Sequence, residues 1–179
     1  MGIYCCKENI VSNKMTDSNQ NQDTQEDNNL PKHLNLSEID FFIPDIDKAR
    51  VLKIYDGDTI TIICRPKNAN VNLYKYSVRI AGIDCPEIRT NNENEKKIAK
   101  KARDELGLLL FKNIVCLKNI KPDKYGNRIV AEVWYENINI SEWLIKKGYA
   151  VTYDGGKKNP PKCWLQHFNT INNIDSNKH

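Results

Sequence analysis

The sequence predicts a domain that is mostly β with flanking helices, arranged as a five-stranded Greek-key barrel of the OB type. Three observations predict this fold. Five short stretches carry the apolar and β-branched residues typical of strands, a long stretch with helical periodicity follows the third of them, and a shorter helical stretch follows the fifth. OB barrels often bind oligonucleotides, but the fold alone assigns no function.

The predicted strands are separated by recognisable turns. The first two flank Asp56-Gly57-Asp58, where we expect the glycine to need a positive φ, and Gly82 allows a bend near the end of the third. The loop 121–128 separates the last two. The five predicted strands cover residues 49–54, 59–64, 74–83, 114–117 and 129–135.

Two helices are predicted, over residues 93–112 and 140–147. In the first, apolar residues fall on one face and lysines cover much of the remainder, which is typical of a solvated helix face. Gly107 lowers helix stability by about 1 kcal/mol relative to alanine, and we expect close packing as the reason. Asn139 and Gly148 are suitable residues to begin and end the second helix. The apolar face of the first helix comprises Ile98, Ala99, Ala102, Leu106, Leu109 and Leu110.

The chain divides into four parts by composition. Residues 1–30 are polar and are expected to be disordered, and residues 31–48 form an apolar arm that is either a short helix capped by Ser37 or extended. Residues 49–154 form the barrel domain. Residues 155–179 form a carboxy-terminal extension, partly frayed, with a brief apolar patch from Trp164 to Phe168.

The charge is distributed unevenly along the chain. The formal net charge is +4, but residues 1–48 hold 4 lysines against 9 acids, while residues 49–179 hold 23 basic residues against 14 acids. The basic part therefore contains the predicted barrel, as binding of a polyanion requires, although a solubilising surface would look the same.

The amino-terminal sequence predicts an intracellular protein, either cytoplasmic or membrane-associated through a lipid. No secretory leader or membrane-spanning stretch is recognisable, and the six cysteines show neither zinc-site spacing nor a dense disulfide framework. Gly2, Cys5 and Cys6 could carry acyl chains, but Cys6 stands where the myristoylation pattern prefers Ser or Thr. An unmodified end is the alternative.

One stretch concentrates polar chemistry at the end of an apolar strand. Arg79, Asp84 and Glu87 lie within nine residues, and Pro86 ends the strand there. Packing of a core does not require these charges. Residues 56–59 (Asp-Gly-Asp-Thr) and 123–128 (Asp-Lys-Tyr-Gly-Asn-Arg) look like its partners.

In this order and spacing the three motifs resemble the staphylococcal nuclease family, over about residues 49–153. The resemblance implies an OB barrel and a calcium-dependent endonuclease that cuts DNA and RNA with little sequence preference and leaves 3′-phosphates. Two alternatives remain open, a catalytically inactive OB module that binds nucleic acid or protein, and a lipid-anchored scaffold. We expect a monomer.

Hydrolysis of a phosphodiester needs fixed cations, because negative charge grows on the phosphate oxygens during attack. Arg79 and Arg128 suit this role, since a guanidinium stays charged and its planar fork matches two phosphate oxygens. Compared with the simplest family pattern, this chain has one additional residue, Asn127, immediately before the arginine. The three histidines lie in the arm and the tail, so histidine catalysis is not expected.

The acidic residues suit a hard cation. Asp58 and Asp84 supply carboxylate oxygens, and by resemblance the ion is Ca²⁺ with the main-chain carbonyl of Cys85 as a further ligand. Asp56 would orient a metal-bound water. Cys85 replaces the threonine that the family often has, and its thiol could make the site sensitive to oxidation or soft metals.

The remaining roles also follow from the resemblance. Glu87 would act as the general base on the attacking water. Lys124 and Tyr125 would bind a flanking phosphate of the substrate.

Overall fold

The computed structural model describes residues 35, 37, 39–70, 72–124 and 128–173. The proposed acylation sites Gly2, Cys5 and Cys6 and the predicted substrate residue Tyr125 lie outside these residues. Two units are distinguished, residues 1–39 and 40–179, and the fold below is that of the second unit.

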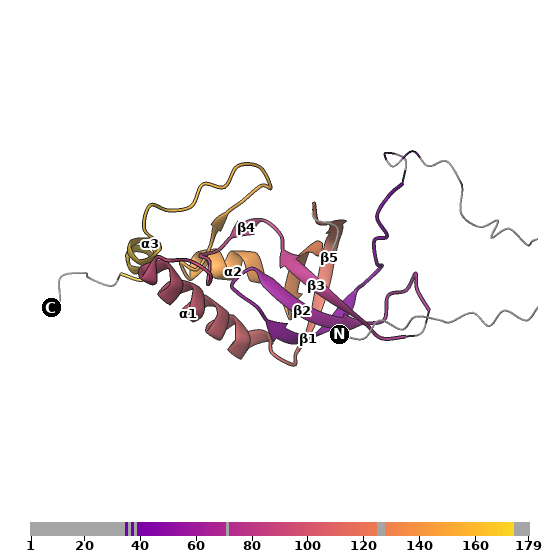
Figure 1. Ribbon diagram of the computed structural model, residues 1–179. Coiled ribbons are helices and arrows are strands. Elements are labelled where there is room, and N and C mark those ends of the chain that lie inside the picture. The colour runs from indigo at the N-terminus through magenta and orange to yellow at the C-terminus, as the bar shows by residue number, and fades with distance from the viewer. Residues whose placement is uncertain (1–34, 36, 38, 71, 125–127, 174–179) are drawn as a thin grey trace, which may run out of the picture. The chain divides into compact units, whose positions relative to one another are not determined.

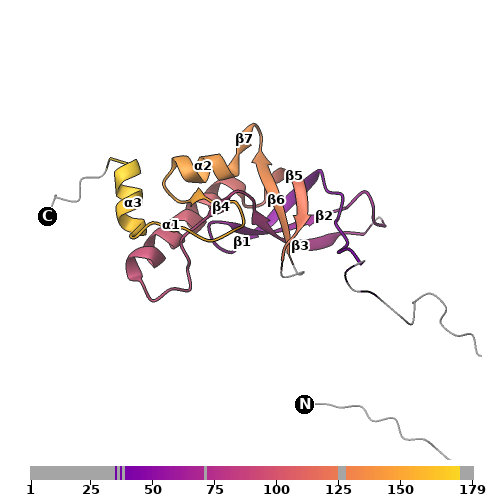
Figure 2. The same cartoon turned by 90° about the horizontal axis from the view of Figure 1, so that it is seen from above.

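Five strands close a barrel. The sheet order is β3-β2-β1-β5-β6-β7, and parallel pairing of β3 with β6 joins the two ends of the five-stranded set. Figures 1 and 2 show the helices gathered at one end of this barrel. The five barrel strands are β1 (Lys48–Ile54), β2 (Thr59–Cys64), β3 (Tyr74–Ile80), β5 (Ile114–Pro122) and β6 (Ile129–Tyr135). The predicted OB-type barrel is confirmed.

Three short strands complete the sheet structure. The third predicted strand ends at Ile80, and after a turn at Gly82 (φ +80°) the chain forms β4 (Ile83–Asp84), which pairs with β8 (Val151–Thr152). The strand β7 (Ile138–Asn139) pairs with the end of β6. The predicted bend at Gly82 is confirmed.

The fourth predicted strand is longer than expected. β5 continues five residues beyond Leu117, and its register against β6 shifts between Lys118 and Lys121. Asn119 has φ +53° there, a conformation that a regular strand does not contain. Asn119 therefore marks a bulge that strand periodicity in the sequence did not reveal.

The helices begin and end close to the predicted residues. The helix α1 (Glu93–Leu110) is capped by Asn92, whose side chain accepts hydrogen bonds from two main-chain amides. It buries its predicted apolar face except for Leu109, which is half-buried. The helix α2 (Ile140–Lys146) is capped by Asn139 in the same way. The helix α3 (Trp164–Ile171) packs on α1, and its Phe168 also stacks on Tyr149, which follows α2, with ring centroids 5.2 Å apart.

The arm does not form a helix between Ile39 and Asp47. Phe41 and Phe42 are more than 60% exposed and Ile46 is buried, so the extended alternative holds for this part. None of the helices among the described residues is long and apolar enough to cross a membrane. Four described cysteines, at positions 64, 85, 116 and 163, carry free thiols.

At Gly57 and Gly107 the surroundings of the glycine differ from those predicted. Gly57 does not have a positive φ. Instead, a Cβ atom there would lie 2.9 Å from Cys85 Sγ, so the turn needs glycine for space. The expected close packing at Gly107 is also wrong, because a Cβ atom would meet only Ile54 Cγ1, at 3.8 Å.

We therefore expect Gly107→Ala to raise the free energy of unfolding by about 1 kcal/mol, because alanine stabilises a helix and its methyl group fits. Guanidinium unfolding measures the change. Gly57→Ala is the matched control, and the contact with Cys85 should make it destabilising. A loss of stability in Gly107→Ala would contradict the account of this helix.

Candidate active site

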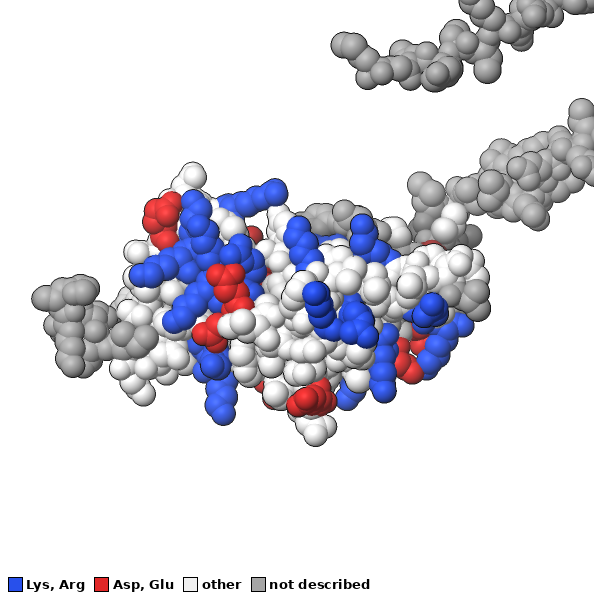
Figure 3. All heavy atoms as spheres, turned by 90° about the horizontal axis from the view of Figure 1, so that it is seen from below, with Lys and Arg blue, Asp and Glu red and all other residues white. Residues whose placement is uncertain are grey.

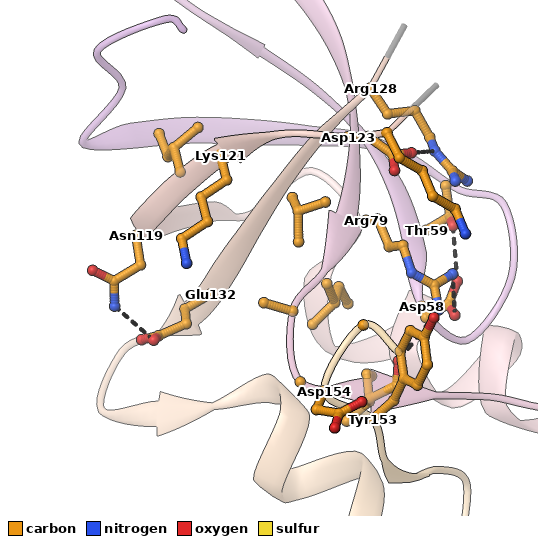
Figure 4. Close-up of a pocket in the computed structure, with 18 of the residues that line it drawn as sticks. Asp58, Thr59, Arg79, Asn119, Lys121, Asp123, Arg128, Glu132, Tyr153 and Asp154 are labelled. Atoms are coloured by element: carbon orange, nitrogen blue, oxygen red, sulfur yellow. Dashed lines mark hydrogen bonds and ion pairs between the residues drawn. The ribbon is translucent and has the colours of Figure 1, made fainter. Parts of the chain in front are cut away.

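A cleft of about 980 Å³ opens beside β2, β3, β5 and β6. Most of the residues singled out from the sequence line it. Figure 4 shows Asp58 and Arg79 facing each other on one side, with Arg128 and Asp123 next to them on the same side. The predicted residues that line the cleft are Asp56, Asp58, Arg79, Glu87, Lys124 and Arg128.

Arg79 joins the two predicted metal-binding carboxylates. Its Nη1 lies 2.8 Å from Asp58 Oδ2, and its Nη2 lies 3.6 Å from Asp84 Oδ1 and donates a hydrogen bond to the carbonyl of Ile83 at 3.3 Å. Asp58 and Asp84 are both buried. The two aspartates, 26 positions apart in sequence, therefore contact the same guanidinium group.

Strand pairing explains this convergence. Antiparallel pairing of β2 with β3 places Thr59 opposite Arg79, and the amide of Ile80 donates a 2.7 Å hydrogen bond to the carbonyl of Asp58. The turn at Gly82 then reverses the chain enough for Asp84 to return to the same guanidinium. Thr59 Oγ1 donates to Asp58 Oδ1 at 2.8 Å, which fixes the carboxylate.

Burial governs the ionisation of this group. Desolvation raises the pKa of Asp58 to about 7 despite the opposing effect of Arg79, and the charge of Asp56 acts in the same direction as burial. The attraction of Arg79 therefore does not fully offset the burial of Asp58. For Arg79, burial acts to lower the pKa, but the charges of Asp58 and Asp84 outweigh it and the pKa is raised, so the guanidinium stays charged.

Glu87 lies at the cleft with a side chain that is 56% exposed. Its main-chain amide donates a hydrogen bond to Glu95 Oε1 at 3.0 Å, and Thr90 Oγ1 donates to the other oxygen of Glu95 at 3.0 Å. The first turn of α1 thus positions the segment after Pro86. The Glu87 carboxylate itself accepts a hydrogen bond from Lys158 Nζ at 3.2 Å.

Arg128 reaches the cleft from the start of β6. Its Nε donates to Asp123 Oδ2 at 2.6 Å, and Asp123 is buried. Parallel pairing sets Val78 opposite Ile129, so Arg128 enters beside the strand that carries Arg79. Despite the additional residue Asn127 before it, Arg128 lines the cleft.

The structure changes the reading of Asp56 and Cys85. Asp56 Oδ1 accepts a hydrogen bond from the amide of Asp58 at 3.3 Å, so it stabilises the turn in addition to lining the cleft. Burial, followed by the charges of Asp58 and Asp56, raises the pKa of Cys85 well above its usual value. The thiolate is the reactive form, so the expected sensitivity of this thiol to oxidation or soft metals is not favoured.

Two observations bear on whether these residues fit a divalent cation. The part of the chain that the structure describes contains no group of three or more His, Cys, Asp or Glu side chains that could hold a metal ion. However, Asp84 Oδ1 is buried, and among the described residues only charged groups contact it, with Lys158 Nζ at 2.8 Å and Arg79 Nη2 at 3.6 Å. The aspartates thus fit an open site in which water and substrate oxygens complete the coordination, and not a closed protein cage.

Three residues of the cleft were not singled out as site residues from the sequence. Tyr153 lines it, with its ring 5.7 Å from Arg79 Cζ, and Asp123 orients Arg128. Lys158 contacts both Asp84 and Glu87. Asp123 belongs to the motif at residues 123–128 and could have been found there, whereas no sequence signal distinguishes Lys158 from neighbouring Lys157.

Comparison with known proteins agrees with this fold and cleft. The family model described as "Staphylococcal nuclease homologue" matches residues 77–169, just over half of the chain. The chain belongs to this family, as the resemblance implied.

Individual relatives are moderately similar. Endonuclease Htp3 of Saprolegnia parasitica is 30% identical over 118 residues, which are 59% of this chain and 56% of the relative. An uncharacterized endonuclease of Haemophilus influenzae is 32% identical over 104 residues (58% and 51%), and a probable endonuclease of Schizosaccharomyces pombe is 37% identical over 86 residues (44% and 37%). The chain thus spans about half the length of these curated relatives, or less.

The raised pKa of Asp58 predicts a pH dependence of stability. The folded protein binds this proton with a pKa of about 7, whereas the unfolded chain binds it only near pH 3.8. Protonated Asp58 therefore stabilises the folded state at low pH, and this stabilisation is lost as the pH rises through about 7. Between pH 5 and pH 8, the free energy of unfolding of the wild type should fall by at least about 1 kcal/mol more than that of Asp58→Asn.

Urea unfolding of both proteins in chelator measures this difference, because other titrating groups cancel in the comparison. A difference that stays constant with pH, or grows in favour of the wild type toward pH 8, would show that Arg79 holds Asp58 ionised throughout.

Proposed function

We propose that the protein is a calcium-dependent phosphodiester endonuclease of low sequence specificity that cuts DNA and RNA and leaves 3′-phosphate products. The single observation that supports this most is the sharing of the Arg79 guanidinium by two buried aspartates, of which Asp58 lines a cleft together with Arg79, Arg128 and Glu87, while Asp84 contacts Arg79 and does not line the cleft. The endonuclease names of several relatives support the same class of reaction.

The two arginines would bind and stabilise the phosphate. Both are anchored by carboxylates, Arg79 by Asp58 and Asp84 and Arg128 by Asp123, so little reorientation is needed when substrate arrives. Donors held in place before the reaction stabilise developing charge more effectively than mobile ones. The loss of one such donor typically lowers the rate about 10²- to 10³-fold.

Glu87 would accept the proton of the attacking water. Its carboxylate is exposed at the cleft while its main chain is fixed by Glu95, which suits a group that must reach a water molecule. Asp58 and Asp84 would hold the Ca²⁺ ion, together with the main-chain carbonyl of Cys85, water and a substrate oxygen. When bound, such an ion supplies positive charge for the phosphate oxygens and lowers the pKa of a nearby water.

The basic surface supports binding of a polyanion. Figure 3 shows lysine and arginine side chains gathered over the part of the molecule that contains α1. Some of these charges are compensated, because Lys96 pairs with Glu93 and Arg103 with Asp104. Binding through phosphate contacts should weaken steeply as the salt concentration rises.

Digestion of plasmid DNA, single-stranded DNA and RNA tests this function. We expect cleavage with Ca²⁺, none in chelator, and losses of about 10²-fold or more for Arg79→Ala and for Glu87→Gln. Asp47→Asn and Lys67→Ala are matched controls, because these two residues pair with each other outside the cleft and away from α1, and both variants should cleave like the wild type. The ends of the products should resist ligation until a 3′-phosphatase has acted.

Cleavage that persists in chelator and in Glu87→Gln would refute this mechanism. If the wild type binds nucleic acid without cutting it under any of these conditions, the protein is a binding module.

We also propose that the amino terminus is a lipid tether, with an acyl chain at Gly2 and a second at Cys5 or Cys6. A single acyl chain holds a protein only marginally at a membrane, so two would be needed. Labelled myristate in a eukaryotic translation extract should be incorporated by the wild type and not by Gly2→Ala, and the variant should leave the membrane fraction. Equal recovery of both proteins in the membrane fraction would show that an acyl chain at Gly2 does not anchor the protein.

A further inference from the structure

The Asp84–Glu87 pair already holds a cation supplied by the protein. Lys158 Nζ lies 2.8 Å from Asp84 Oδ1 and 3.2 Å from Glu87 Oε1, so one ammonium group bridges the two carboxylates. Apart from Lys158, the cationic group near Asp84 Oδ1 is Arg79, at 3.6 Å. Lys158 therefore occupies the side of Asp84 that faces Glu87.

This oxygen has an unusual environment. Asp84 is 3% exposed, and among the described residues its Oδ1 has no neutral hydrogen-bond donor, so Lys158 Nζ at 2.8 Å is its closest polar partner. A buried carboxylate oxygen is costly unless a cation or a hydrogen-bond donor compensates it. The ammonium of Lys158 provides that compensation through charge.

Lys158 is not held in place by the core. It comes from the segment between β8 and α3, which forms no helix or strand and contains Gly155 at φ +96° and the pair Pro160-Pro161. The Lys158 side chain is 45% exposed. It can leave the carboxylates without disturbing a buried apolar side chain.

A divalent cation and this ammonium would need the same oxygen. We propose that Lys158 is a tethered cation that neutralises Asp84 and Glu87 in the metal-free protein and is displaced when a divalent cation binds, so that Lys158 sets the metal affinity of the site. The inference rests on the proposed calcium site, but metal binding can be measured without nuclease activity. Displacement also frees the Glu87 carboxylate for its proposed role as a base.

Calcium titration by calorimetry, without nucleic acid, tests the proposal. Removing the competing ammonium in Lys158→Met should tighten Ca²⁺ binding about three- to thirtyfold. Lys157→Met is the matched control. It removes the same charge from the neighbouring position, and the Lys157 side chain forms no ion pair with Asp84 or Glu87 in the structure. It should change the affinity by less than about twofold.

A second measurement separates competition from a general charge effect. In chelator, Lys158→Met should have a lower thermal midpoint than the wild type, because Asp84 Oδ1 loses its nearest cation. In saturating Ca²⁺ the two midpoints should coincide.

The possible outcomes differ in what they overturn. If Lys158→Met binds Ca²⁺ no more tightly than the wild type, or if Lys157→Met gains as much, the competition is refuted and the calcium site stands. If neither the wild type nor Lys158→Met binds Ca²⁺, Mn²⁺ or Mg²⁺, the metal site fails and the competition fails with it.

Discussion

The shared ion pairing of Arg79 is the constraint on which this site depends. Two buried aspartates, Asp58 in the turn before β2 and Asp84 in β4, need compensation by cations, and one guanidinium contacts both of them. Removing one partner of a buried pair leaves an uncompensated charge, so the three groups are stabilised only together. The strand pairing and the turn that bring them together therefore serve the site as much as the barrel.

The same arrangement explains why the cleft can take up a metal ion without a dense cage of ligands. Its carboxylates are balanced by side-chain cations in the metal-free protein, since Arg79 and Lys158 both contact Asp84 Oδ1. Arg79 is fixed between strands, whereas Lys158 extends from an irregular segment and is exchangeable. A cation site that is neutralised internally binds weakly at first and gains affinity when substrate phosphate adds ligands, which is consistent with an open coordination shell.

Much of this could be predicted from the sequence because strand alternation and helical periodicity extend over six residues or more in the main elements. The two-residue strands β4, β7 and β8 are too short to show periodicity, and the bulge at Asn119 interrupted the signal of β5. The motif residues were found because their spacing matched a family. Lys158 was missed because its role exists only when the loop folds over the acids, and Gly57 was misread because its neighbour Cys85 is distant in sequence.

The central claim is that the aspartates, the arginines and a divalent cation act on one phosphate. The most direct test is the calcium affinity of the Glu87→Gln protein, which should not cut, measured by calorimetry with and without a short single-stranded oligonucleotide. If the site is shared, the oligonucleotide tightens calcium binding and calcium tightens oligonucleotide binding by the same factor. Equal calcium affinity in the two titrations would mean that metal and phosphate do not meet in this cleft, and the account would be wrong.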